Sequence, residues 1–306
     1  MSSKDGQLFL ITGATGHTGA KTVHLLLERG HRVRAFVHRE DVRSQALAAA
    51  GAEIAVGDLL DFQAVSAAMR GVTNAYFCYP IEPGLVEATV IFAQAAVEAN
   101  VKSVVNMSQI SARREAQSDA ARHHWLAERL LDRTNLITTH LRPTFFAEWI
   151  EWYFARDEDK GTLRLPMGDA RHAPIVGEDQ GYVIAAVLEN PEAHDRQIYF
   201  LHGPKELDHH GIAEEVSRAL DIPVTYEPIT IDEYTQSLET EVGFPPHLVQ
   251  HLRNVVIDYH DGVFAGTNNL IEAIGNRTPM TVEEYVRSRK EAFAQTGPYA
   301  IAPKPR

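Results

Sequence analysis

The sequence predicts an α/β protein with a doubly wound parallel sheet, and three observations on its first 143 residues support this fold class. Short β-rich runs alternate with stretches of helical periodicity, which is typical of βαβ units. The runs FLIT and VVNM are apolar on both faces, as expected of strands covered by helices on both sides. Gly30 and Gly71 follow helical stretches, where glycine commonly ends a helix.

The expected elements follow one another in strict alternation. The strands are expected at Leu8–Thr12, Arg32–Val37, Glu53–Val56, Ala75–Cys78, Ser103–Met107 and Ile137–Leu141. The helices between them are expected at Gly19–Arg29, Arg43–Ala50, Phe62–Arg70, Pro83–Ala99 and Ala120–Arg133. Ligands of open α/β sheets bind beyond the carboxyl ends of the strands, so we expect the functional site at that edge.

The alternation breaks after Pro143. Phe145–Phe154 is rich in aromatic residues, and residues 161–177 are expected to form a loop. Beyond that loop we expect a helix, a strand, a helix, a strand and two C-terminal helical stretches, the first four at Asp179–Leu188, Gln197–His202, Gly211–Leu220 and Val224–Pro228. We therefore predict a sheet domain over residues 1–143 and a smaller α+β substrate-binding region over residues 144–306, interleaved with the first domain and covering its crevice.

Composition limits the classes of function. The formal net charge of −12 argues against a nucleic-acid-binding surface, because phosphate contacts need clustered Lys and Arg. There is no metal-ligand spacing, no apolar signal core and no apolar run of the ~18 residues that span a bilayer. The single cysteine, Cys78, excludes an intrachain disulfide and fits a reducing compartment. We expect a cytoplasmic protein without membrane or nucleic-acid partners, and homodimer formation stays open.

A glycine-rich loop carries the strongest functional signal. In FLITGATGHTGAK, Gly13 allows a tight turn out of the strand, Gly16 allows backbone to approach a pyrophosphate, and Gly19 allows close packing of the next helix. That helix presents free N–H groups and a partial positive charge to phosphates. A plain turn with incidental glycines is the alternative. The position at the first strand–helix junction favours a Rossmann dinucleotide site, to which we also assign Thr15, His17 and Thr18.

The spacing Gly-x-x-Gly-x-x-Gly resembles the atypical short-chain dehydrogenase/reductases, and in particular their NmrA-like branch. Further matching segments are GDLLD at 57–61, LRPTFFAEW at 141–149, LRLPMGDARHAPIVGEDQGYVIAAVL at 163–188 and NNLIEAIGNRTPMTVEEYVRSRKEAF at 268–293. Within this branch the chain is similar to the quinone reductase and triphenylmethane reductase members. The resemblance covers nearly the whole chain and implies NAD(P) binding. It also implies two classes of function, since some members reduce small molecules and others bind the cofactor without turnover.

The end of the second predicted strand indicates which cofactor binds. A carboxylate there would accept a hydrogen bond from the 2′-OH of NAD, whereas a basic side chain pairs with the 2′-phosphate of NADP. The strand runs into His38 and Arg39 before any acidic residue, and Arg39 can supply a forked guanidinium. In the resembling family the arginine aligns with His38, so here it is shifted by one position. We expect NADP(H), with NAD(H) and a merely solvated Arg39 as the alternatives.

Two further strand ends are expected to contact the cofactor. The resemblance places Asp58 and Leu59 along the adenine, although Asp58 could also cap the helix that begins near Phe62. Tyr79 and Pro80 end the fourth strand, where the resemblance places backbone beside the nicotinamide ribose. The β pattern points the neighbouring Cys78 into the core, so a reactive thiol is not expected.

The residues expected to act in catalysis are His124 and Ser108. Classical short-chain reductases use a Tyr-x-x-x-Lys pair, which the helix sequence SDAARHHWLAERLL lacks. The resemblance places His124 where many members have a lysine, four residues before Glu128, and an imidazole there could bind the nicotinamide ribose or donate a proton. Ser108 follows the fifth strand. Alternatively, His124 has no role and lies on a half-exposed helix face, and Ser108 only forms a hydrogen bond with the nearby backbone.

Aromatic residues are expected to form the substrate pocket. Phe145, Phe146 and Trp149 follow Pro143 at the crevice, with Trp152 close by in sequence. Core packing is the alternative, but rings beside a nicotinamide also suit a flat, conjugated substrate. The sequence therefore predicts an NADPH-dependent reductase of quinone-like or other conjugated small molecules. The alternatives are a non-catalytic NADP(H) sensor and, less favoured without the Tyr/Lys pair, a reductase of a specific metabolite carbonyl.

Overall fold

The computed structural model describes residues 6–301 and confirms the predicted Rossmann fold. Seven parallel strands form one sheet in the order β3-β2-β1-β4-β5-β6-β9. Their bounds are β1 Leu8–Ile11, β2 Arg32–Val37, β3 Glu53–Val56, β4 Asn74–Phe77, β5 Ser103–Met107, β6 Ile137–Pro143 and β9 Gln197–Leu201. The chain order reverses between β1 and β4, and a crevice opens at such a point in doubly wound sheets.

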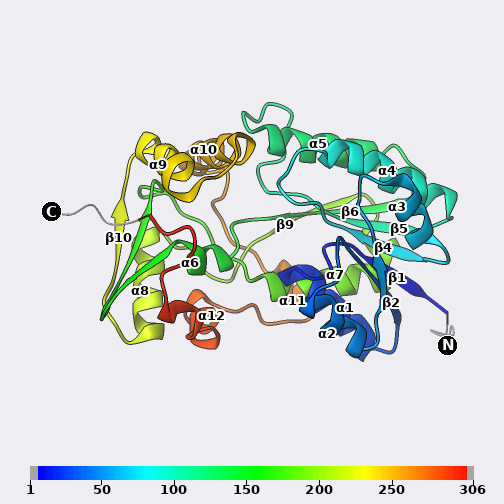
Figure 1. The fold of residues 1–306 in the computed structure, drawn as a ribbon, viewed down its shortest axis with the longest axis horizontal. Helices are drawn as coiled ribbons and strands as arrows, with labels where there is room; N and C mark the ends of the chain where they lie inside the picture. The colour runs from blue at the N-terminus through cyan, green and yellow to red at the C-terminus, as the bar shows by residue number, and fades with distance from the viewer. Residues whose placement is uncertain (1–5, 302–306) are drawn as a thin grey trace.

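Helices cover both faces of this sheet, as the apolar strands require (Figure 1). One face carries α3, α4 and α5, at Phe62–Met69, Leu85–Glu98 and Asp119–Leu131. The opposite face carries α1, α2, α7 and α11, at His17–Glu28, Val42–Ala49, Gly177–Glu189 and Leu270–Gly275. Each face has its own buried apolar cluster. Because α7, β9 and α11 follow Pro143, the chain returns to the first sheet after leaving it.

The remaining C-terminal segments form a second, smaller unit at the left of Figure 1. Its three-stranded sheet has the order β10-β8-β7, with bounds Val224–Pro228, Lys160–Leu165 and Phe154–Asp157. Its helices are α6 Glu148–Tyr153, α8 His209–Leu220, α9 Ile231–Ser237, α10 Pro246–His260 and α12 Val282–Ser288. Short helical turns occupy Pro191–His194, Leu238–Val242 and Ala292–Ala294. The assignment of residues 144–306 to substrate binding stays a prediction.

Two local expectations for this second half were wrong. Residues 161–177 were expected to be a loop, but β8 occupies Lys160–Leu165. Gly161 resembles a turn signal, whereas here its missing side chain makes room for the ring of Phe154, which a Cβ would approach to 2.3 Å. The two expected C-terminal helical stretches are four helices, α9 to α12, because Gly243, Gly262 and Asn276 adopt positive φ between them.

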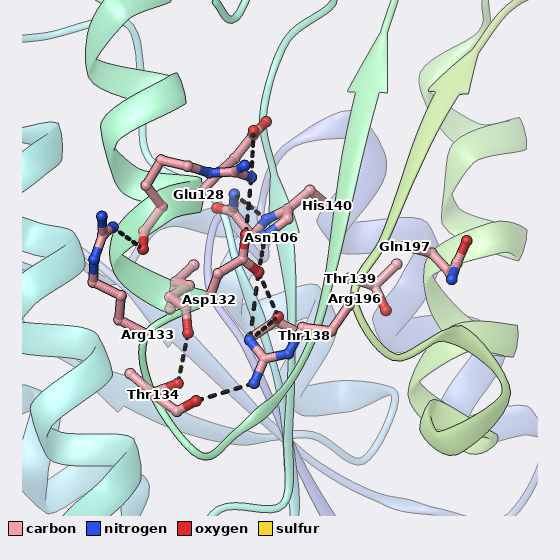
Figure 2. A network of polar contacts seen from close by, with 12 residues as sticks. Asn106, Glu128, Asp132, Arg133, Thr134, Thr138, Thr139, His140, Arg196 and Gln197 are labelled. Carbon is pink, nitrogen blue, oxygen red and sulfur yellow. Dashed lines mark hydrogen bonds and ion pairs between the residues drawn. The ribbon is translucent and has the colours of Figure 1, made fainter. Parts of the chain in front are cut away.

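A buried polar network fixes α5 against the sheet (Figure 2). The His140 ring lies between Asn106 Nδ2, at 3.1 Å from Nδ1, and Asp132 Oδ1, at 3.1 Å from Nε2. One helical turn earlier, the fully buried carboxylate of Glu128 accepts two hydrogen bonds from Arg142, of 2.8 and 2.6 Å. Paired in this way, buried charges hold a helix at a fixed position on its sheet.

No helix within residues 6–301 is long and apolar enough to cross a bilayer.

Candidate active site

The glycine loop, residues Gly13–Gly19, turns the chain from β1 into α1 as its spacing predicts. Gly13 has a φ of +57°, in the region that favours glycine, and its carbonyl accepts a hydrogen bond from Gly16 N at 3.0 Å. A Cβ on Gly19 would lie 2.2 Å from that carbonyl oxygen. Gly16 precedes α1 without a side-chain cap. The first N–H groups of α1 are therefore open toward the crevice, as an anion site requires.

Arg39 is an exposed cation at the end of β2. It follows His38, which is also exposed, and it forms no hydrogen bond or ion pair with any residue in the described part of the chain. The neighbouring Arg43 differs, because its guanidinium binds the carboxylate of Asp41 at 2.5 Å. Asp41 in turn caps α2 by accepting hydrogen bonds from two backbone N–H groups. The Arg39 guanidinium is thus available to an external anion, whereas that of Arg43 is already paired.

The capping alternative for Asp58 was wrong. Asp61 caps α3, accepting hydrogen bonds from the backbone of Gln63 and Ala64. The Asp58 carboxylate accepts a hydrogen bond from Leu60 N, at 2.9 Å, in the exposed turn after β3. Leu59 beside it is half-buried against the sheet core. Asp58 and Leu59 are therefore free to border a ligand at this strand end.

A cavity of about 290 Å³ lies next to the glycine loop, between the two units. We call it the aromatic cavity. It brings together residues from six segments of the chain, namely His17, Tyr79 with Pro80, Ser108, His124, Phe145 with Phe146, and Trp149 with Trp152. All of these had been singled out from the sequence. None of the described residues lining the cavity is Asp, Glu, Lys or Arg.

Four buried polar atoms around this cavity lack hydrogen-bond partners among the described residues. They are Ser108 Oγ, Gln109 Nε2, His124 Nδ1 and Thr144 Oγ1. A buried polar group without a partner is costly, and in folded proteins nearly all are satisfied. These four atoms leave unused hydrogen-bonding capacity beside the cavity.

His124 is held neutral by its surroundings. Burial, together with the nearby His251, His123 and Arg142, lowers the pKa of His124 to about 3. Its helix, α5, is anchored one turn later through Glu128 and Arg142, so the ring has a fixed position in the cavity wall. A neutral imidazole can donate one hydrogen bond but holds no extra proton at neutral pH. His123 lies outside the aromatic cavity and lines an adjoining smaller one.

The C-terminal half adds wall residues that sequence reasoning missed. His251, Leu252 and Val255 come from α10, and Phe264 follows it. No motif marks α10, whose only signal was a histidine on the apolar face of an amphipathic helix. Such histidines more often belong to a core than to a site. Their contribution here depends on where α10 packs.

Glu148 is a second residue that the sequence did not single out. Its carboxylate is buried, accepts a hydrogen bond from Gly177 N at 2.9 Å, and lies 3.8 Å from His17 Nδ1 of the glycine loop. Burial raises the pKa of Glu148 to about 7, although the hydrogen bond from Gly177 opposes this.

Burial also raises the pKa of the Cys78 thiol, which disfavours the reactive thiolate.

A family model described as the NmrA-like family matches residues 5–286. The chain belongs to the NmrA-like family. The match spans both units, so the α+β unit that carries α10 is part of the family's architecture as well.

Three relatives within or near this NmrA-like family show how far the likeness extends. An NAD(P)H azoreductase of Xenophilus azovorans is 27% identical over 288 residues, covering 94% of this chain and 99% of the relative. The structure of the NADPH-dependent quinone oxidoreductase 2 of Escherichia coli complexed with NADPH has a TM-score of 0.80 at 22% identity, covering 92% and 99% of the two chains. The negative transcriptional regulator NmrA in complex with NADP has a TM-score of 0.81 at 16% identity, covering 94% and 97%. At these identities the two solved structures support the fold.

Proposed function

We propose that this protein is an NADPH-dependent reductase that transfers a hydride to a quinone-like or other conjugated small molecule. The observation that carries the proposal is the aromatic cavity beside the glycine loop, with its four unsatisfied polar atoms. His17 belongs to both the loop and the cavity wall, so a dinucleotide lying along the loop would reach the cavity. The names of an NAD(P)H azoreductase and an NADPH-dependent quinone oxidoreductase among the relatives support the same activity class.

The residues present fit a dinucleotide. The open N-terminus of α1 and the bare backbone at Gly16 suit a pyrophosphate, and the unpaired Arg39 suits a 2′-phosphate, which favours NADP(H) over NAD(H). Asp58 with Leu59 would border the adenine, and Tyr79 with Pro80 the nicotinamide ribose. When bound, the reduced nicotinamide supplies the hydride.

The wall chemistry favours a flat, conjugated acceptor. The cavity has aromatic side chains from Phe145, Phe146 and Trp149 and no charged residue to pair with a charged substrate group. His124 is neutral and Ser108 Oγ is free, so both can position polar atoms of the nicotinamide or the substrate by hydrogen bonds. Hydride transfer to a quinone or a dye cation needs little further acid–base chemistry from the protein. The missing Tyr-x-x-x-Lys pair is consistent with such acceptors.

Turnover is the test. NADPH oxidation, followed by its absorbance, is measured with a panel of quinones, azo compounds and triphenylmethane dyes. We expect consumption of one NADPH per acceptor reduced by two electrons. If no acceptor oxidises bound NADPH above background, the reductase proposal is wrong.

The alternative is a non-catalytic NADP(H) sensor, favoured by the likeness of the fold to the regulator NmrA. A sensor would bind NADPH and NADP tightly without reducing any acceptor, and its oligomeric state or partner binding would depend on the redox form of the cofactor. Light scattering with each cofactor form separates the two candidates and also tests homodimer formation.

A further inference from the structure

Helix α10 docks on the first turn of α5 through a set of polar contacts, and the two helices lie close together in Figure 1. Ser118, the N-cap of α5, lies 2.8 Å through its Oγ from Nδ1 of His251. On the same turn of α10, the side chain of Gln250 accepts from Asp119 N at 3.3 Å and donates to Gln117 O at 2.9 Å. These contacts bring the buried His251 ring into the wall of the aromatic cavity.

The Ser118 hydroxyl determines which ring nitrogen of His251 carries the proton. Ser118 Oγ already accepts a hydrogen bond from the backbone of Ala121, at 3.2 Å. Among the described residues, the only hydrogen-bond acceptor paired with the Ser118 hydroxyl is His251 Nδ1. The hydroxyl therefore donates its proton to Nδ1. Nδ1 is then an acceptor and the ring proton sits on Nε2. Burial also lowers the pKa of His251 to about 4, so at neutral pH the ring carries one proton.

Nε2 is the side of the His251 ring left for a ligand. It forms no hydrogen bond with any residue between 6 and 301, and it is not enclosed as the unpaired Nδ1 of His124 is. Because Nδ1 is bound to Ser118, the N–H of Nε2 is fixed in both tautomer and direction. A donor fixed in this way stabilises developing negative charge without reorganising.

We propose that His251 donates a hydrogen bond from Nε2 to the acceptor oxygen of the substrate, and that Ser118 is the positioning residue that fixes this donor. The inference rests on the proposed reductase function and refines its substrate class to acceptors whose reduction places negative charge on a lone-pair atom. It also assigns the specificity-determining donor to the C-terminal unit.

Two classes of acceptor distinguish a hydrogen-bond donor at His251 from a residue that only supports the structure. A quinone that accepts a hydride from reduced nicotinamide becomes a hydroquinone anion, whose oxygen gains the charge and then takes a proton from solvent. A cationic triphenylmethane dye that accepts the same hydride at its central carbon becomes neutral, with no new oxyanion. A hydrogen bond from His251 therefore favours quinone reduction and leaves dye reduction nearly unchanged.

A matched pair of substitutions isolates the Nε2 donor. His251→Asn keeps a polar atom near Nδ1 for Ser118 and removes the Nε2 donor, whereas His251→Gln places an amide N–H near the Nε2 position. We expect His251→Asn to lower kcat for 1,4-naphthoquinone by about ten- to a hundredfold. Decolourisation of a triphenylmethane dye should change little, and His251→Gln should restore much of the quinone activity.

Ser118 and Gln250 provide the positioning test and its control. Ser118→Ala should lower quinone turnover in the same direction as His251→Asn, but less, and Ser118→Thr should retain it. Gln250→Ala removes the neighbouring contacts between α10 and α5 without touching His251, so the ratio of quinone to dye activity should stay unchanged. Thermal unfolding of each variant identifies those that fold as the wild type does.

Two results would overturn the inference. One is an equal loss of quinone and dye activity in His251→Asn, and the other is a changed activity ratio in Gln250→Ala. If the wild type reduces no acceptor of the panel, the reductase proposal fails separately. The donor is then tested by quenching of Trp149 and Trp152 fluorescence with 1,4-naphthoquinone. His251→Asn should weaken this binding relative to His251→Gln, and equal binding rejects the donor.

Discussion

The glycine loop and the aromatic cavity adjoin each other at the carboxyl edge of the sheet, yet they are assembled from the chain in different ways. The loop is seven consecutive residues whose function depends on backbone, because the absence of side chains at Gly13, Gly16 and Gly19 shapes it. The cavity wall consists of side chains from separate strands, loops and helices, including α10 of the smaller unit. The loop is therefore encoded locally, whereas the cavity exists only once the two units have packed.

This difference predicts that the two regions respond differently to substitution. A change in the loop acts by steric exclusion and should affect every ligand that lies along it. A change in the cavity wall removes one side-chain contact and should affect one step or one class of ligand.

Gly19→Ala should have the largest effect. Its Cβ would lie 2.2 Å from the Gly13 carbonyl oxygen, which is backbone and cannot rotate away, so the loop must shift. We expect loss of measurable NADPH binding and a destabilisation of about 1–3 kcal/mol. Gly16→Ala is the matched control, because its Cβ meets the same oxygen at 3.3 Å and its φ of −88° suits any residue. It should unfold as the wild type does but bind NADPH weakly, in calorimetric titration.

Arg39→Ala should have the second-largest effect on NADPH binding. Loss of a charge-assisted contact to a 2′-phosphate should weaken NADPH by about ten- to a hundredfold and leave NADH nearly unchanged. Arg43→Ala, which removes an arginine already bound to Asp41, is the control and should have little effect on either cofactor. Equal weakening of both cofactors in Arg39→Ala would show that Arg39 does not distinguish them.

His124→Ala tests whether the cavity wall acts on turnover. A hydrogen bond made mainly in the transition state appears in kcat, whereas a uniform binding contact appears in KM. We expect turnover to fall by about tenfold, the effect of one neutral hydrogen bond, with a smaller loss of NADPH affinity. An equal loss of turnover and cofactor affinity would remove His124 from the chemistry while sparing the reductase proposal.

Glu148→Gln should have the smallest effect and a distinctive pH dependence. The folded-state pKa of Glu148, about 7, lies above its unfolded value of 4.5, so its contribution to stability is present below pH 4.5 and lost as pH rises through 7. Glutamine keeps the acceptor for Gly177 N and avoids that loss. Relative to the wild type, the variant should gain roughly 2–5 °C in Tm between pH 5 and pH 8. A difference in Tm that does not change with pH would contradict the raised pKa.

The buried histidines give the opposite pH dependence and serve as an internal reference. Burial lowers the pKa values of His124 and His209 to about 3, so the stability they contribute is present above pH 6.5 and lost as pH falls toward 3. Both the wild type and Glu148→Gln should therefore lose stability on acidification below pH 6.5. The difference between the two proteins should be largest above pH 7 and should shrink as pH falls toward 4.5.

Sequence patterns were sufficient to predict the parts of the fold that depend on neighbours along the chain. The alternation of strands and helices gave the Rossmann fold, with element ends within a few residues, because period and helix-ending glycines are local signals. The glycine spacing gave the loop and its open helix terminus for the same reason. A glycine can mark a turn or leave room for a neighbouring side chain. The loop prediction failed at Gly161 because its missing side chain makes room for an aromatic ring.

Which side chains meet around the cavity depends on tertiary packing. Ser118 and His251 are 133 residues apart in the chain, and their contact depends on how α10 docks against α5. Likewise, the buried state that makes His124 neutral and holds a proton on Glu148 arises from packing between segments, which no motif records. Burial and long-range hydrogen bonding change the pKa and tautomer of a side chain, and the residue type alone does not reveal either change. The chemistry of this cavity was therefore fixed by the packing of its two units.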